Sequence, residues 1–147
     1  MIRAAFCLAL VACAPEGPLV RADRWTLVDG TCSADAVSQE GDAIEIRTQT
    51  CSSATVEQPL GRALAKGTLI RADISHTSLT GDAAMARIAV TLGATTLEES
   101  FAVPTAAAIH TLQGTLAEDM AAGSTVRFAV ANHGSNSYVL HSITAER

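Results

Sequence analysis

Short alternations of apolar and polar residues constrain the fold of this chain more than any other feature of its sequence. Val126, Phe128 and Val130 are separated by single smaller or charged residues. This period of two places the three apolar side chains on one face of a β-strand. A polar loop follows, and a second apolar run begins at Tyr138. We expect the two segments to be neighbouring strands, joined as a long-looped β-hairpin.

The same alternation recurs along the rest of the chain, between turn signals rich in glycine and aspartate. Pro59 predicts an edge position for its strand, because proline cannot donate a ladder hydrogen bond. Residues 104–108 are expected to form a connector with a weak helical preference. About eight or nine short strands in total predict an all-β fold, a single jelly-roll-like antiparallel β-sandwich. The other strands are expected at Trp25–Val28, Ala43–Thr50, Thr55–Leu60, Thr68–Ser75, Ala84–Leu92, Thr95–Val103 and Ile109–Leu116.

The composition indicates a thin, aliphatic interior and excludes one class of partner. Aromatic residues make up 3% of the chain and apolar residues 48%, so the core has to be built from Val, Leu, Ile and Ala. Such a core suits a thin sandwich better than a deep ligand cavity. The net charge is −5, and Lys66 is the only lysine. Without a basic cluster to neutralise phosphates, nucleic acid is excluded as a partner.

The first thirteen residues have the features of an export signal. Arg3 gives a positive start, and an uninterrupted apolar run extends from Ala4 to Ala12. The run is too short to span a bilayer as a helix, which takes about 20 residues. It has the length of the apolar region of a secretory signal.

The end of this run resembles the lipobox of bacterial lipoproteins, since it reads Leu-Val-Ala-Cys and closes at Cys13. The resemblance implies cleavage just before Cys13 and a diacylglyceryl group on its thiol. Each buried methylene of such a lipid contributes about 0.8 kcal/mol to anchoring. The alternative is an ordinary secretory signal. The predicted division is a signal peptide at residues 1–12, the lipidated cysteine and a tether at 13–22, and a β-sandwich domain at 23–147.

The lipobox resemblance also predicts where the protein is located. Ala14 follows the cysteine, where by resemblance an aspartate would retain the protein at the inner membrane. We therefore expect a lipid-anchored protein of the bacterial cell envelope, at the outer membrane. If the signal is an ordinary one, we expect a periplasmic or secreted protein. The membrane, reached through the lipid anchor, is the first predicted partner.

The remaining cysteines predict one disulfide. Of the four cysteines in the sequence, Cys7 lies in the signal and Cys13 is the candidate for lipidation. Cys32 and Cys51 are left as a pair in an exported chain, where a disulfide is the default. Closing a loop of about 20 residues in this way stabilises the fold by on the order of 3 kcal/mol. A metal site, the competing interpretation, would need two further ligands, and no histidine lies between or near these cysteines.

The sequence contains no recognisable catalytic or metal-binding motif. The four histidines are scattered and include no His-Glu-x-x-His. There is no Gly-x-Ser-x-Gly elbow, and the carboxylate pairs are adjacent residues, which point to opposite faces of a strand. We expect no catalytic activity, no metal site and no cofactor. A structural calcium ion held by turn aspartates at Asp29, Asp42 and Asp82 is left open.

The pattern of short strands resembles the jelly-roll sandwiches of carbohydrate-binding modules and galactose-binding-like domains. The resemblance covers most of Trp25 to Ala145, including the run Ala-Gly-Ser-Thr-Val-Arg-Phe before the last loop. It implies a fold and carries over no binding residue.

The last polar loop is the candidate ligand site. Asn132, His133 and Asn136 offer amides and an imidazole to a sugar hydroxyl or a peptide edge, and Tyr138 and Trp25 are the aromatic side chains available beside them. The alternative is structural, because asparagine and glycine supply the turn conformations that a connection needs. We predict a cell-envelope lipoprotein with a non-catalytic interaction or scaffold module, whose partner is an envelope protein or a glycan. The alternative function is a carbohydrate-binding module that uses this loop.

Overall fold

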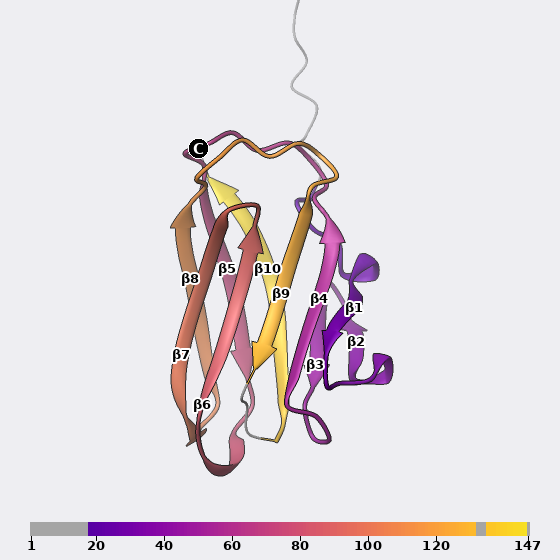
Figure 1. Ribbon diagram of the computed structural model, residues 1–147, viewed down its shortest axis with the longest axis vertical. Coiled ribbons are helices and arrows are strands. Elements are labelled where there is room, and N and C mark those ends of the chain that lie inside the picture. Colours follow the sequence, from indigo (N-terminus) through magenta and orange to yellow (C-terminus); the bar gives the residue numbers. More distant parts are fainter. Residues whose placement is uncertain (1–17, 132–134, 147) are drawn as a thin grey trace, which may run out of the picture.

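Ten β-strands form two antiparallel sheets in the computed structural model of the protein, which describes residues 18–131 and 135–146 (Figure 1). Sheet A has the strand order β1-β4-β9-β6-β7, and sheet B has the order β2-β3-β10-β5-β8. The sheets pack face to face, which confirms the prediction of an all-β, jelly-roll-like sandwich, with ten strands in the described residues instead of eight or nine. Two short 3-10 turns, η1 and η2, flank β1. The elements are η1 (Ala22–Arg24), β1 (Thr26–Gly30), η2 (Ala34–Ala36), β2 (Val37–Glu40), β3 (Ala43–Arg47), β4 (Ser53–Pro59), β5 (Leu69–His76), β6 (Leu79–Leu92), β7 (Thr95–Thr105), β8 (Ala108–Thr115), β9 (Thr125–Ala131) and β10 (Ser137–Glu146).

The inner faces of the two sheets form one core, which is mainly aliphatic, as the composition predicts. The strands bury alternate side chains; in β4, for example, Ala54, Val56 and Gln58 are buried and the residues between them are not. Removing a Val, Leu or Ile side chain from water contributes about 1.5–3 kcal/mol. The largest fully buried side chains include Tyr138, Phe128, Ile46, Ile70, Ile74, Leu79, Ile88 and Leu92.

The last two strands lie in different sheets, so the predicted hairpin is wrong. β9 pairs with β4 and β6 in sheet A, whereas β10 pairs with β3 and β5 in sheet B. The connection between them crosses from one sheet to the other, and Figure 1 shows β9 and β10 in separate layers. Alternation along a strand determines which face is buried but not which strand lies beside it.

Two local predictions are also corrected, and one strand was not predicted. Pro59 is the last residue of β4, opposite Thr125 of β9, and β4 lies between β1 and β9 instead of at an edge. A proline at the end of a strand removes no hydrogen bond from the interior of the ladder. Residues 104 and 105 continue β7 and Ala108 opens β8, so the connector has no helix. The strand β2, which was not expected, pairs with β3 around Gly41.

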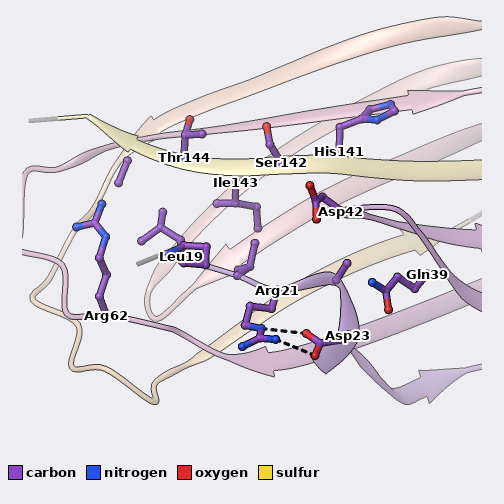
Figure 2. Close-up of a pocket in the computed structure, with 14 residues that line it drawn as sticks. Leu19, Arg21, Asp23, Gln39, Asp42, Arg62, His141, Ser142, Ile143 and Thr144 are labelled. Atoms are coloured by element: carbon purple, nitrogen blue, oxygen red, sulfur yellow. Dashed lines mark hydrogen bonds and ion pairs between the residues drawn. The ribbon is translucent and has the colours of Figure 1, made fainter. Parts of the chain in front are cut away.

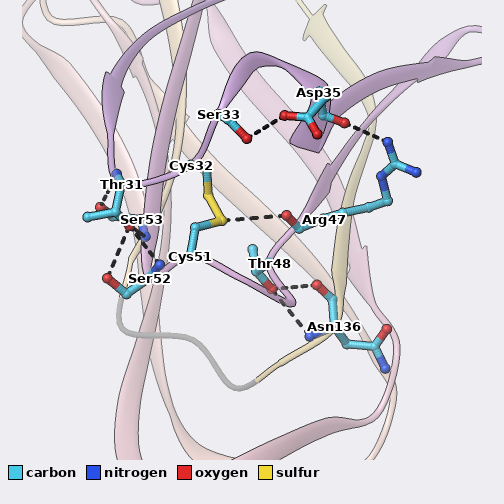
Figure 3. Close-up of a disulfide and its surroundings, with 10 residues drawn as sticks. All are labelled: Thr31, Cys32, Ser33, Asp35, Arg47, Thr48, Cys51, Ser52, Ser53 and Asn136. Atoms are coloured by element: carbon cyan, nitrogen blue, oxygen red, sulfur yellow. Dashed lines mark hydrogen bonds between the residues drawn. A yellow bond between two sulfur atoms is a disulfide. The ribbon is translucent and has the colours of Figure 1, made fainter.

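Cys32 and Cys51 form the predicted disulfide, with their Cα atoms 4.8 Å apart (Figure 3). The bridge ties the segment before η2 to the connection between β3 and β4. Beside it, the hydroxyl oxygen of Thr31 accepts hydrogen bonds from the backbone N–H groups of Ser52 (2.7 Å) and Ser53 (3.0 Å). The disulfide is therefore part of a hydrogen-bonded corner at one end of the sandwich.

The predicted signal and Cys13 lie outside the described residues, so cleavage, lipidation and membrane location stay predictions. Within residues 18–131 and 135–146, no helix is long and apolar enough to cross a membrane. The last part of the predicted tether belongs to the packed domain, because Leu19 is buried in the core.

Candidate functional site: a cleft beside strand β10

A cleft lies beside β10 where its neighbour β3 ends. β3 pairs only with Ser137 to Leu140 of β10, whereas β5 pairs with β10 from Tyr138 to Glu146. Past Leu140, the part of β10 that β3 leaves uncovered borders a cleft with a volume of about 780 Å³ (Figure 2). The other walls are the turn of the β2–β3 hairpin and the N-terminal segment at residues 18–23, which we call the strap.

The strap is fixed to the domain by side-chain burial and by hydrogen bonds. Leu19 is only 5% exposed, and its carbonyl oxygen accepts a bond from the Gly61 N–H at 2.8 Å. The Arg21 backbone N–H donates to the side-chain oxygen of Gln58 at 2.8 Å, and Gln58 is itself buried. A Cβ atom at residue 61 would collide with the Pro18 carbonyl oxygen. The path of the strap therefore requires a glycine at residue 61.

The cleft combines an apolar floor with a polar rim. Leu19 of the strap and Ile143 of β10 both line it, and both are buried (Figure 2). Around them stand side chains that donate or accept hydrogen bonds. An apolar lining with a few placed polar groups is the usual composition of a site for a small molecule. The polar lining residues include Arg21, Gln39, Asp42, Arg62, Ser142 and Thr144.

Two polar side chains of β10 beside the cleft have fixed positions. A β-bulge lies between Leu140 and Ser142, so His141 is an extra residue in the ladder. The Nε2 atom of His141 lies 2.7 Å from the Ser75 hydroxyl, and the Ser142 hydroxyl donates to the Asp73 carboxylate at 3.4 Å. Bulges commonly re-aim side chains at functional sites. Here the bulge marks the point where β10 leaves β3 and begins to line the cleft.

Asp73 organises the outer face of sheet B next to the cleft. Its carboxylate accepts hydrogen bonds from the Arg71 guanidinium, with Nη2 at 3.0 Å, and from the Thr111 hydroxyl at 2.7 Å, in addition to Ser142. These bonds, Arg71 first, hold the pKa of Asp73 below its ordinary value, because they stabilise the charged form. The Ser142 hydroxyl makes the longest of these bonds, and its side chain points away from Leu19 and Ile143 (Figure 2).

Three of the predicted ligand residues come from the polar loop, and two of these, Asn132 and His133, lie outside the described residues. The third, Asn136, is half-buried and supports the fold. Its side-chain amide donates to the Ser78 carbonyl at 2.8 Å, and its own carbonyl accepts a bond from the Thr48 N–H at 2.7 Å (Figure 3). Asn136 therefore ties the start of β10 to two neighbouring connections.

The two aromatic residues of the predicted site are not close to each other. Tyr138 is 0% exposed, and burial raises its pKa, so its ring cannot serve as a platform for a ligand and this prediction is corrected. Trp25 is half-buried and lies near the Pro59 end of β4, whereas the polar loop follows Ala131 at the Ser53 end. The structure does not bring these side chains into one site.

Sequence reasoning missed the cleft, because the cleft depends on strand lengths and not on a motif. β2 has four residues and β3 has five, whereas β10 has ten. A short hairpin beside a long strand leaves part of that strand uncovered. The one signal for the cleft in the sequence was the turn at Gly41-Asp42. Because β3 begins only after this turn, at Ala43, it does not reach the second half of β10.

A second group of ring side chains lies where β5, β7, β8 and β10 meet. The His76 ring stacks on Phe101 with ring centroids 5.0 Å apart, and it lies 5.1 Å from His110 and 5.8 Å from Tyr138. Its Nδ1 donates to the Thr77 carbonyl at 2.7 Å. Burial, the main cause, lowers the pKa of His76 below 6.5, so the ring is neutral at neutral pH. The group is a packed part of the core.

The described part of the chain contains no cluster of potential metal ligands. No group of three or more His, Cys, Asp or Glu side chains in residues 18–131 and 135–146 is placed to hold a metal ion. The aspartates considered for calcium are far apart along the fold, with Asp29 in β1, Asp42 in the β2–β3 turn and Asp82 in β6. The expectation of no metal site and no cofactor stays a prediction, with a structural calcium ion left open.

Comparison with known proteins finds no match at the level of sequence families. No protein-family model matches the chain, and no curated protein matches it. Solved structures do match in three dimensions.

Three solved structures have a similar fold at low sequence identity. TmCBM61, solved in complex with β-1,4-galactotriose, is 13% identical, with a TM-score of 0.50; the match covers 86% of this chain and 90% of that one. The arabinose-bound α-L-arabinofuranosidase MgGH51 is 11% identical, with a TM-score of 0.54, over 83% of this chain. Tailspike protein 4 of bacteriophage CBA120 is 13% identical, with a TM-score of 0.52, over 84% of this chain. This chain spans only 23% and 20% of the latter two. The protein therefore has the jelly-roll sandwich fold found in carbohydrate-binding modules.

Proposed function

We propose that this protein is a non-catalytic carbohydrate-binding module, held in the bacterial envelope by a lipid on Cys13, and that its sugar site is the cleft beside β10. The observation that carries the proposal is the cleft, which sets a polar rim around an apolar floor. The fold supports it, because the match spans 90% of TmCBM61, a carbohydrate-binding module solved with a galactose trisaccharide. The lipid and the envelope location rest on the lipobox resemblance.

A sugar ring has the two kinds of surface that this cleft can contact. Its C–H groups can pack on the small accessible part of Leu19 and Ile143, each 5% exposed, and its hydroxyls both donate and accept hydrogen bonds. The rim offers donors and acceptors in the Arg21 guanidinium, the Gln39 amide and the Asp42 carboxylate. No Phe, Trp or Tyr is among the described residues that line the cleft, so the apolar contact with each sugar is small. We expect a Kd on the order of 1 mM, which corresponds to about −4 kcal/mol.

The proposal reverses the order of the two functions predicted from the sequence. The scaffold module came first there, and the carbohydrate-binding module was the alternative. The structural neighbours favour the carbohydrate-binding module, and the cleft replaces the polar loop as its site because Tyr138 is buried. The non-catalytic character is proposed from the same likeness to TmCBM61, which is matched over nearly its whole length.

Glycan titration tests the proposal. The mature chain, made soluble by Cys13→Ser, is screened on a glycan array and titrated with β-1,4-galactotriose by NMR. We expect a bound glycan whose affinity falls about tenfold, or about 1.4 kcal/mol, in the double variant Gln39→Ala and Asp42→Ala. Thr91→Ala, on the outer face of sheet A, is the matched control and leaves the affinity unchanged. No binding at millimolar glycan would end the proposal.

A further inference from the structure

The cleft and the predicted membrane tether share one wall. The strap that lines the cleft continues directly from the chain that follows Cys13. Its start cannot swing away from the domain, because Leu19 is buried and its carbonyl accepts a hydrogen bond from Gly61. Pro18 itself lines the cleft. The point where the tether joins the domain is therefore fixed at the cleft.

The tether is short compared with the domain. From Cys13 to Pro18 the chain advances five residues, and an extended chain covers at most about 3.6 Å per residue, so the two Cα atoms lie within about 18 Å of each other. The ten residues of β10 rise about 3.3 Å each, which gives the domain a length of more than about 30 Å along this strand. The cleft end therefore stays near the lipid in every orientation that the tether permits.

The far end of the sandwich has a different set of connections. Arg62 lines the cleft, which places the connection after β4 at the cleft end. The bonds between Thr48 and Asn136 place the connections before β4 and β10 at the opposite end, and Figure 1 shows the two sets at opposite ends of the strands. A polymer that lies far from the membrane would meet the far end first, not the cleft.

We infer that the cleft is held at the membrane surface and binds a saccharide that the membrane itself displays on a lipid head group. The inference rests on the proposed function, for both sugar binding and the lipid on Cys13. Charge does not supply the attraction. Loss of residues 1–12 removes one positive charge, Arg3, and takes the net charge from −5 to −6, and an acidic domain is not drawn to an anionic lipid surface. The short tether brings the cleft to the sugar.

A quenching experiment on the lipidated protein tests the position of the cleft. Cys32 and Cys51 are bridged, Cys7 is removed with the signal and Cys13 carries the lipid, so one introduced cysteine can be labelled selectively. A fluorophore is placed at the exposed cleft residue through Thr144→Cys, or at the exposed far-end residue through Asp82→Cys. The protein is reconstituted in phosphatidylcholine vesicles that contain a lipid with a nitroxide on its head group.

We expect the label at residue 144 to be quenched at least fivefold more strongly than the label at residue 82. Twenty Gly/Ser residues inserted between residues 17 and 18 should abolish the difference. Equal quenching in the unextended protein, or stronger quenching at residue 82, overturns the inference. Mass spectrometry of Cys13 reports on the anchor separately: an unmodified thiol overturns the anchor and the inference together.

Vesicle flotation tests the kind of ligand. The soluble Cys13→Ser protein is floated with phosphatidylcholine vesicles that contain a digalactosyl diacylglycerol lipid, and β-1,4-galactotriose is the soluble competitor. We expect co-flotation with these vesicles, release by the trisaccharide, and no flotation with plain phosphatidylcholine. Binding to the trisaccharide without flotation overturns the inference and leaves the proposed function standing. Binding to neither probe, with no hit on the glycan array, overturns both.

Discussion

The two halves of β10 have opposite surroundings. The first half, Ser137 to Leu140, lies between β3 and β5, and its Tyr138 is fully buried. The second half, His141 to Glu146, pairs only with β5 among the described strands and borders the cleft. Where β3 is present, β10 contributes to the core; past the point where β3 stops, β10 also forms one wall of the candidate cleft. The site arises because β3 is short, and no special motif is needed for it.

The two halves are also supported by different parts of the chain. The first half is held from its start by the bonds between Asn136 and Thr48, near the disulfide corner (Figure 3), and by the ring cluster around His76. The second half faces the strap, which is itself held by Gly61 and Gln58. Substitutions in the first group should therefore change folding stability, and substitutions in the second should change ligand binding.

The largest effect is expected at Tyr138. Tyr138→Ala removes a fully buried aromatic side chain, and such changes cost about 3–5 kcal/mol. Urea denaturation measures the free energy of unfolding. The matched control is Thr144→Ala in the exposed second half, which should stay within about 0.5 kcal/mol of the parent protein. A similar loss of unfolding free energy in both variants would contradict the proposed difference between the two halves of β10.

The next largest effect is expected from loss of the disulfide. The double variant Cys32→Ser and Cys51→Ser should lower the free energy of unfolding by about 3 kcal/mol, because the unfolded chain regains the entropy of an open loop. Below the unfolding transition, the affinity for the bound glycan should not change, because the bridge lies at the end opposite the cleft. A weaker glycan affinity in the fully folded variant would show that the two halves of β10 are coupled.

Gly61→Ala, unlike loss of the disulfide, is expected to weaken glycan binding as well as stability. The new Cβ collides with the Pro18 carbonyl oxygen, so the strap has to shift, at a cost of about 1–3 kcal/mol together with most of the glycan affinity. Gly114→Ala is the matched control, because its Cβ meets only the flexible end of the Leu97 side chain. The control should keep its glycan affinity. Equal loss of glycan affinity in both variants would contradict a role of the strap in glycan binding.

The smallest effect is expected in the pH dependence of folding stability, which we attribute to His76 beside the first half of β10. Burial lowers the pKa of His76 in the folded protein below its ordinary value of 6.5, so the unfolded chain binds the proton first. Stability is therefore full above pH 6.5 and falls as the pH drops from there toward the folded-state pKa, by at most about 1.4 kcal/mol per pH unit.

His76→Phe tests this pH dependence in denaturation curves measured from pH 8 to pH 5. The variant should lose this slope. The neighbouring residues Phe101 and Tyr138 are unchanged in it, and so is His110, which pairs with Glu99 at 3.0 Å. His141→Asn, in the exposed second half, should retain the slope of the parent protein. If the His141 variant loses the slope instead, the acid sensitivity belongs to the cleft.

Much of the fold could be predicted from the sequence, because alternation and turn residues are local signals. The alternation of Val126, Phe128 and Val130 correctly indicates a strand with these three residues buried. The pairing of Cys32 with Cys51 was expected from the number of cysteines and from the predicted export of the chain. Strand partners are not local. Whether β10 lies beside β9 or beside β3 and β5 depends on the packing of the whole sandwich, and the hairpin prediction failed for that reason.

The candidate site was less predictable than the fold. Polar loop residues such as Asn136 have the same composition whether they bind a ligand or close a turn, and here Asn136 closes the connection. Tyr138 was expected at a surface because it follows a polar loop, but alternation places its side chain inward. The cleft depends on the difference in length between β3 and β10 and on Leu19, which lies in a stretch that resembles a tether.

Because Pro18 and Ala145 line one cleft, the two ends of the domain can be joined by a short linker and new termini opened elsewhere. The tight turn at Lys66-Gly67 is exposed and lies outside every strand, as sites that accept circular permutation usually do. In such a permuted protein the strap becomes an internal segment, and the proposed sugar site no longer depends on where the polypeptide begins.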